Sequence, residues 1–117
     1  MKKKICEVIS NYRTPFKDPL ILKKGEILNI EKKTTDYPGW IWCRTKTRKK
    51  GWVPVNYILI DKDKAKLLQD YNATELDASV GEKLTIEKQE SGWAWVRTSN
   101  GKRGWIPLEN VKIIGKK

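Results

Sequence analysis

Residues 39–45, which read GWIWCRT, and residues 51–54, which read GWVP, decide the fold because both stretches occur twice. The second copies are GWAWVRT at residues 92–98 and GWIP at residues 104–107. The order of the motifs and nearly all of their spacings match. Chance is a poor explanation for such a match, so we interpret the chain as one structural unit written twice.

Each copy reads as a series of short β-strands. The motif GEILNIEK at residues 25–32 returns as GEKLTIEK at residues 81–88, and both contain apolar, strand-forming residues. Asn100-Gly101 lies between two such runs, as in a tight hairpin. No stretch has a helical stripe. The pattern predicts an all-β protein with two domains, at residues 1–60 and 65–117, joined by a charged linker at residues 61–64.

Charge suggests an acidic partner but does not require one. The 117-residue chain carries a net charge of +11, with 15 basic and 6 acidic side chains in residues 1–62 against 10 and 8 in residues 63–117. Such an excess favours nucleic acid, anionic lipid or acidic protein as a partner, and it equally serves solubility. The lysines are spread over both repeats, which favours solubility.

Several function classes are disfavoured by what the chain lacks. It has no histidine, no Ser or Cys in a motif with a base, and no glycine-rich phosphate loop, so we expect no enzyme and no cofactor. Cys6 and Cys43 lack metal-ligand spacing. Cys43 aligns with Val96 and is expected to be a small core residue, whereas Cys6 aligns with Ala65 and needs no special role. The basic start at residues 2–4 precedes no apolar run, and no stretch has the length of a membrane span. We therefore expect a cytoplasmic monomer.

The motifs together resemble the SH3 family over almost the whole chain. The first repeat supplies NY at residues 11–12, KKGE at 23–26, GW at 39–40 and GWVPVNY at 51–57. The second supplies DYNA at residues 70–73, VGE at 80–82, GW at 92–93 and GWIP at 104–107. The resemblance implies two consecutive five-stranded SH3-like barrels.

The resemblance also implies a groove for a proline-rich or extended peptide, which can dock between aromatic ridges with little loss of entropy. In the first repeat this groove would contain Tyr12, Trp40, Trp52, Pro54, Asn56 and Tyr57, with Asp18 and Asp36 in the acidic loop that receives a ligand arginine. In the second repeat only Tyr71, Trp93 and Pro107 remain. The first repeat is therefore the expected principal binder.

Both repeats depart from the family pattern. Ser10 and Gln69 replace the first tyrosine of the start motif, which removes one wall of a proline pocket. In the second repeat Glu109 and Asn110 replace the closing asparagine and tyrosine. This repeat is thus a poor polyproline binder or has a different ligand. It also resembles bacterial SH3 domains that bind cell-wall peptides.

Strand alternation separates core from surface within the tryptophan motifs. If Ile41, Ala94, Cys43 and Val96 face inward, the tryptophans at positions 40, 42, 93 and 95 face outward. Outward tryptophans indicate an interaction surface. We expect ligand contact for Trp40, and cross-strand or inter-domain packing for Trp42 and Trp95.

Nucleic-acid binding is the main alternative function. Aromatic rings among basic residues can stack bases while lysine and arginine neutralise phosphate. The candidate strip comprises Arg44, Lys46, Arg48, Lys49 and Lys50. The outward aromatic positions match a peptide groove better, so we favour a peptide partner.

Overall fold

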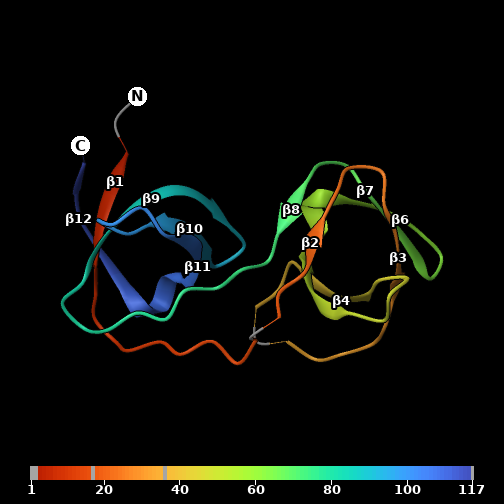
Figure 1. Cartoon of the computed structure of the whole chain (residues 1–117), viewed down its shortest axis with the longest axis horizontal. Helices are drawn as coiled ribbons and strands as arrows, with labels where there is room; N and C mark the ends of the chain where they lie inside the picture. The colour runs from red at the N-terminus through yellow and green to blue at the C-terminus, as the bar shows by residue number, and fades with distance from the viewer. Residues whose placement is uncertain (1–2, 17, 36, 117) are drawn as a thin grey trace. The chain divides into compact units, whose positions relative to one another are not determined.

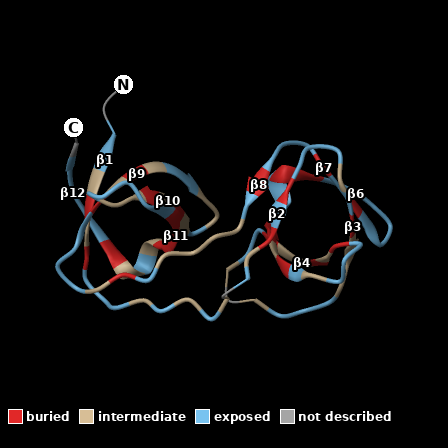
Figure 2. Cartoon of the chain, viewed as in Figure 1, coloured by how far each residue is buried: buried red, intermediate tan, exposed pale blue. Residues whose placement is uncertain are grey.

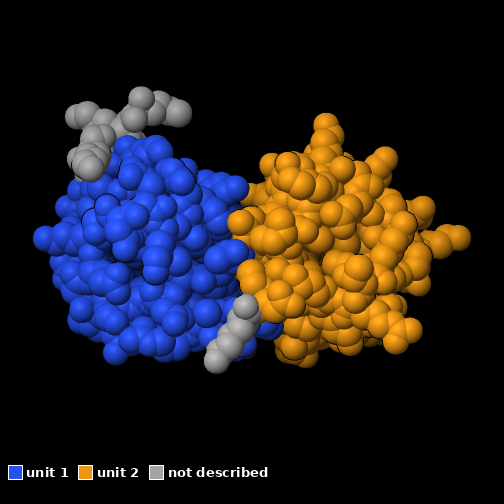
Figure 3. Space-filling view, viewed as in Figure 1, with its two compact units in different colours: residues 1–17, 74–117 blue, residues 18–73 orange. Residues whose placement is uncertain are grey.

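The computed structural model describes residues 3–16, 18–35 and 37–116, and its regular structure is almost entirely β (Figure 1). The chain divides into two compact units (Figure 3). Unit 1 contains residues 1–17 and 74–117, and unit 2 contains residues 18–73. The prediction of an all-β protein with two five-stranded sheets is confirmed.

Unit 1 is a five-stranded sheet in the order β11-β10-β9-β1-β12, in which all strand pairs are antiparallel. Its elements are β1 (Lys4–Val8), β9 (Lys83–Glu90), β10 (Trp93–Arg97), β11 (Arg103–Pro107), the 3-10 turn η2 (Leu108–Asn110) and β12 (Val111–Lys116). The core takes alternate residues of the strands, including Cys6, Leu84, Val96 and Ile106.

Unit 2 repeats this plan with the order β5-β4-β3-β7-β6. Its elements are β2 (Ile21–Leu22), β3 (Ile27–Ile30), β4 (Trp40–Arg44), β5 (Lys50–Pro54), η1 (Val55–Tyr57), β6 (Ile58–Asp61), β7 (Lys64–Leu67) and β8 (Tyr71–Asn72). The short strands β2 and β8 pair with each other. Buried residues line the inside of both units (Figure 2).

The two units exchange their first strands. We call residues 4–16 arm 1 and residues 64–73 arm 2, because each begins its sequence repeat. Strand β1 of arm 1 lies between β9 and β12, which belong to the second repeat. Strand β7 of arm 2 lies between β3 and β6, which belong to the first. The compact units therefore differ from the consecutive domains, residues 1–60 and 65–117, that the repeat predicts.

The predicted linker at residues 61–64 is a hairpin turn inside unit 2. Asp61 pairs with Lys64, and only Lys62 and Asp63 lie between the two strands. Lys62 adopts a positive φ of 58°, as tight turns require. Sequence composition marked these residues as a connection, but a connection this short returns the chain along the strand it has just left.

The loop after each exchanged strand is built by both repeats. In unit 1, Tyr12 and Ala78 exchange backbone hydrogen bonds of 2.8 and 2.9 Å. In unit 2, Ala73 N–H donates to the Leu20 carbonyl at 2.9 Å. We call residues 18–26 and 74–82 the return segments; each stays with the sheet of its own repeat, while the arm opposite comes from the other repeat.

No helix within the described part of the chain has the length and apolar character needed to cross a membrane.

Candidate functional site

Unit 1 contains an aromatic pair whose two rings come from different sequence repeats. Tyr12 of arm 1 packs edge-on against Trp93 of β10, with ring centroids 5.8 Å apart and an interplanar angle of 85°. Both side chains are only partly buried. Pro107 lies opposite Trp93 on β11, and its own side chain is fully buried. Tyr12, Trp93 and Pro107 form what we call the unit 1 cluster.

Asn110 fixes arm 1 beside this cluster. This residue replaces the closing tyrosine of the family pattern, and its Nδ2 donates to the Ser10 carbonyl at 3.1 Å and to the Asn11 carbonyl at 3.2 Å. Ile9 N–H in turn donates to the Asn110 carbonyl at 2.8 Å. A residue that departs from the family pattern thus holds the backbone of the arm that delivers Tyr12.

Unit 2 carries the equivalent group, which we call the unit 2 cluster: Trp40, Pro54, Tyr57 and Tyr71. Tyr71 of arm 2 meets Tyr57 edge-on at 5.5 Å, and its hydroxyl donates to the Trp52 carbonyl at 3.1 Å. Trp40 lies opposite Pro54 in the register of β4 and β5. Asn56 is exposed beside the cluster.

The structure assigns to different units the residues that the sequence placed in one groove. Tyr12 lies in unit 1, whereas Trp40, Trp52, Pro54 and Tyr57 lie in unit 2, and Tyr71 lies in unit 2 rather than beside Trp93. Neither compact unit therefore contains the predicted group of Tyr12, Trp40 and Tyr57 by itself. The physical reason is the arm exchange, which moves each start-motif tyrosine into the other unit.

Trp40 is not open to solvent as the wall of a free groove would be, because only 9% of its surface is exposed. Tyr57 and Tyr71 are also buried, at 6% and 5% exposure. The inward prediction holds for Ala94, Cys43 and Val96, which have no exposed surface. Alternation assigns a side chain to one face of a strand, but it does not say what else packs on that face.

Two further tryptophan pairs lie across neighbouring strands. Trp42 meets Trp52 at 5.0 Å, with the Lys33 ammonium 3.7 Å from the Trp42 ring centre. Trp95 meets Trp105 at 5.4 Å, with Lys88 5.7 Å from the Trp95 ring centre. The cross-strand packing expected for Trp42 and Trp95 is confirmed. Trp52, predicted to line a specificity pocket, is part of such a pair.

The acidic residues proposed for ligand contact differ in their environment. Asp18 forms an ion pair with Lys49 at 2.9 Å while 81% of its side chain remains exposed, so that solvent screens the pair. Asp36 lies outside the described residues. Pro54 and Pro107 end β5 and β11 and lead into the closing 3-10 turns, but both are buried and offer little surface to a ligand.

Glu75 is a site residue that the sequence prediction missed. Its carboxylate accepts hydrogen bonds from the Tyr12 hydroxyl and, at 2.9 Å, from the Thr14 hydroxyl. Burial raises the pKa of Glu75 above its ordinary value, although both hydrogen bonds oppose this shift. The signal available in the sequence was its place just after the DYNA motif, in the loop where the family pattern puts acidic residues.

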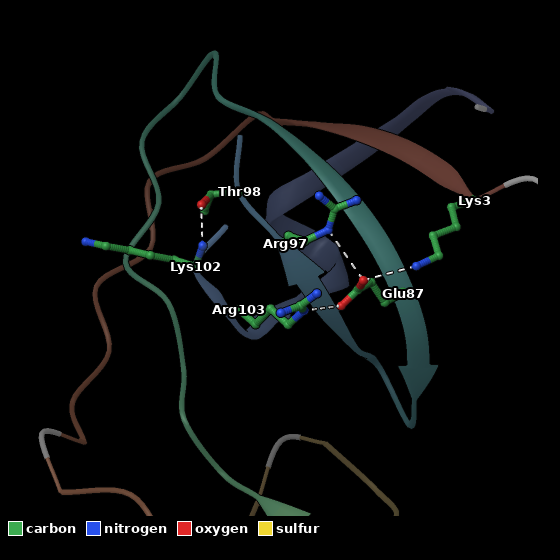
Figure 4. A network of polar contacts seen from close by, with 6 residues as sticks. All are labelled: Lys3, Glu87, Arg97, Thr98, Lys102 and Arg103. Carbon is green, nitrogen blue, oxygen red and sulfur yellow. Dashed lines mark hydrogen bonds and ion pairs between the residues drawn. The ribbon is translucent and has the colours of Figure 1, made fainter. Parts of the chain in front are cut away.

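On the outer face of unit 1, Glu87 forms ion pairs with three cationic side chains (Figure 4). It pairs with Lys3 at 3.1 Å, Arg103 at 2.9 Å and Arg97 at 3.5 Å. Partial desolvation raises the pKa of Glu87, but the hydrogen bonds from Lys3 and Arg103 outweigh it and hold the pKa below its ordinary value.

Glu31 does the same in unit 2, where it pairs with Arg44 at 3.0 Å and Lys50 at 3.2 Å. The Lys50 hydrogen bond is the main reason that the pKa of Glu31 is lowered. Together with the pair between Lys49 and Asp18, these contacts engage three of the five members of the candidate nucleic-acid strip. Less of its positive charge is thus available for phosphate.

Both cysteines are buried and unpaired with each other, and the core position expected for Cys43 is confirmed. Burial raises the pKa of the Cys43 thiol to about 11 and also raises the pKa of Cys6. Among the residues described, no group of three His, Cys, Asp or Glu side chains could hold a metal ion.

Comparison with known proteins defines the class. Residues 5–61 and 64–114 each match the variant SH3 domain family, so the chain belongs to this family and its two sheets are SH3-like. The chain is similar to Intersectin-2 of Mus musculus, with 27% identity over 131 residues, and to Intersectin-1 of Homo sapiens, with 28% identity over 141 residues. Each alignment covers 96% of this chain but only 8% of the relative.

SH3 domains are non-catalytic modules that bind peptides of other proteins, and this chain has the corresponding architecture twice. Each matched stretch contains one arm that lies in the sheet of the other unit. The family matches therefore coincide with the sequence repeats, whereas each aromatic cluster combines residues of both repeats.

Proposed function

We propose that this chain is a non-catalytic adaptor that binds a proline-rich or extended peptide of another protein through the unit 1 cluster. The observation that supports this proposal is the partly exposed edge-to-face pair of Tyr12 and Trp93. Aromatic ridges of this kind can receive a polyproline II peptide, which is already extended and loses little entropy on docking.

The charge of the unit 1 loop adds selectivity. Glu75 accepts a hydrogen bond from the Tyr12 hydroxyl, and Asp77, two residues later, accepts one from Thr14 N–H at 2.8 Å. A ligand that places a basic residue next to its proline-rich core would meet these two carboxylates. A basic, proline-containing peptide is the ligand class that this surface favours.

Unit 2 is the weaker candidate site. Its rings at positions 40, 57 and 71 are buried, so a ligand gains little apolar contact there without movement of the surrounding chain. Asp18, Asn56 and Trp52 remain its polar and aromatic rim. The principal site expected in the first repeat therefore moves to unit 1, because Tyr12 moves there.

Titration of the full chain with proline-containing peptides, with and without flanking arginines, tests the proposal. Amide chemical shifts should centre on Tyr12, Glu75 and Trp93, with micromolar affinity or about −8 kcal/mol. Trp93→Ala should weaken binding by roughly tenfold or more, which corresponds to about 1.4 kcal/mol. The matched control is Trp95→Ala, because Trp95 lies on the same strand but packs against Trp105.

Equal binding by Trp93→Ala and by the native chain would overturn the assignment, as would shifts confined to unit 2. Single-stranded oligonucleotide titrated at low salt tests the alternative. Binding that weakens steeply with added salt and bypasses the unit 1 cluster would favour nucleic acid.

A further inference from the structure

The arms are exchanged although their apolar patterns are interchangeable. Cys6 and Val8 of arm 1 are buried in unit 1, and Ala65 and Leu67 of arm 2 are buried in unit 2. Each pair presents two small or aliphatic side chains at alternate positions. Either arm could therefore fill either sheet, and something other than the core must select the arrangement.

The connection between β6 and β7 provides one selection. The first and last strands of each unit are antiparallel neighbours, as β1 and β12 show. A strand that follows β6 after two residues therefore folds back into the neighbouring position within the same sheet, about 4.8 Å away. Three peptide steps reach at most about 11 Å. If arm 2 docked in unit 1 instead, the end of β6 in unit 2 and the start of arm 2 in unit 1 would have to lie within that distance. This condition is restrictive, because each unit has a radius of gyration of roughly 10 Å.

The polar residues of arm 1 provide a second, independent selection. Arg13 donates to the Ala78 carbonyl at 2.8 Å and to Ser79 Oγ at 3.1 Å. Thr14 N–H donates to the Asp77 carboxylate at 2.8 Å. In the return segment of the first repeat, the repeat alignment places Ile21 where Asp77 stands and Lys23 where Ser79 stands. Arm 1 docked there would lose an acceptor and would bring Arg13 toward a like charge.

We propose that the two-residue turn at Lys62 and Asp63, reinforced by the contacts of Arg13 and Thr14, selects the exchanged arrangement of the arms. It thereby also determines which residues form each aromatic cluster. A longer connection releases the constraint, so that Tyr12 can return to the barrel of Trp40 and Tyr71 to that of Trp93. The proposal concerns chain topology and does not depend on any ligand.

Cross-strand disulfides can report the topology in the full chain. Val8 N–H donates to the Glu82 carbonyl, so Glu7 and Lys83, one residue along, form a non-hydrogen-bonded pair whose Cα atoms suit a disulfide. The exchanged reporter is Glu7→Cys with Lys83→Cys. The unexchanged reporter is Glu7→Cys with Ile27→Cys, because Ile27 takes the place of Lys83 in the first repeat. Both carry Cys6→Ala and Cys43→Val, the residues that the other repeat uses.

At native turn length, mild oxidation should cross-link the exchanged reporter, while the unexchanged reporter stays reduced. The pair Lys66→Cys with Ile27→Cys should also cross-link, and it serves as a second exchanged reporter if Glu7→Cys impairs folding. Insertion of about 12 Gly and Ser residues between Lys62 and Asp63 spans roughly 20 Å. Cross-linking of the unexchanged reporter should then appear, and that of both exchanged reporters should fall.

The control places the same insertion in the Asn100-Gly101 turn, which joins β10 to β11 within unit 1 and should leave the reporters unchanged. Adding Asp77→Ile and Ser79→Lys to the lengthened chain should shift cross-linking further toward the unexchanged reporter. The proposal is overturned if the unexchanged reporter cross-links at native turn length, or if lengthening the turn changes neither reporter while tryptophan fluorescence shows a folded chain.

Discussion

At the scale of single residues, two glycines mark where each return segment packs closely on the sheet of its own repeat. A Cβ at Gly104 would lie 2.7 Å from Leu76 Cγ and 3.1 Å from the Thr74 carbonyl oxygen. A Cβ at Gly51 would lie 2.8 Å from Leu20 Cδ1, and its three nearest atoms all belong to the Leu20 side chain. Each glycine thus allows the return segment of its own repeat to cross its sheet closely.

We expect Gly104→Ala to destabilise the protein more than Gly51→Ala does. The neighbours of Gly104 include backbone atoms, which move less readily than the end of the Leu20 side chain. Overpacking of this kind costs about 1–3 kcal/mol. Urea unfolding of both variants measures it, with Gly115→Ala as a control, since a Cβ there meets no atom within 4 Å. Equal losses at the two sites would contradict the expectation.

Glu75 should make stability fall as the pH rises. Burial raises the pKa of Glu75 in the folded state above the ordinary value of 4.5, so the folded state binds more protons than the unfolded state just above that pH. The free energy of unfolding therefore decreases as the pH rises through this range. Glu75→Gln keeps an acceptor for Tyr12 and Thr14 but cannot ionise.

The stability difference between Glu75→Gln and the native chain should favour the variant more at pH 7 than at pH 4. Denaturant unfolding at both values measures this difference. Glu31 and Glu87 act with the opposite sign, because their lowered pKa values add stability above their unfolded pKa that is lost as acid titrates the folded state. A difference that does not change with pH would show that Glu75 ionises freely.

At the scale of elements, the turn between β6 and β7 carries more structural information than its length suggests. Its residues are charged and exposed, as a linker would be, and sequence composition alone does not distinguish the two. The positive φ of Lys62 is the local mark of a hairpin. The pairing of Leu59 with Lys66 and of Ile60 with Ala65 extends that hairpin along both strands.

Lys62→Gly should stabilise unit 2 slightly, because glycine adopts positive φ without the Cβ penalty of about 1 kcal/mol. Lys62→Val should destabilise it, since a branched Cβ is poorly accommodated there. Thermal unfolding of the two variants checks the order. If Gly and Val behave alike, the turn does not hold the strained conformation.

At the scale of the whole molecule, the exchange makes the two units unequal. Unit 2 is one continuous segment, residues 18–73, whereas unit 1 joins residues 1–17 to residues 74–117. When unit 2 is folded, it holds the two ends of this insertion together through the bond between Ala73 and Leu20. When unit 2 is unfolded, unit 1 must close a loop of that length at a cost of about 3–4 kcal/mol.

This coupling is reciprocal, because a folded unit 1 likewise holds the two ends of unit 2 together. Leu67→Ala and Ile106→Ala remove comparable buried side chains from unit 2 and unit 1, each at a cost of about 2–5 kcal/mol. Amide hydrogen exchange, measured in urea just sufficient to unfold the mutated unit, resolves the units separately. Under these conditions Leu67→Ala should lower the protection of β10, and Ile106→Ala should lower the protection of β4. Independent units would show no such coupling.

The sequence alone determined the repeat, the strand-rich character, and the membership of Cys43 and Val96 in the core. These features depend on local periodicity and on residue type, which act over a few positions. Only the tertiary structure decided which arm joins which sheet, and hence that Tyr12 meets Trp93 and Tyr71 meets Tyr57. Both arms have the same apolar pattern, so the choice depends on the reach of a two-residue turn and on polar contacts between residues more than 60 positions apart.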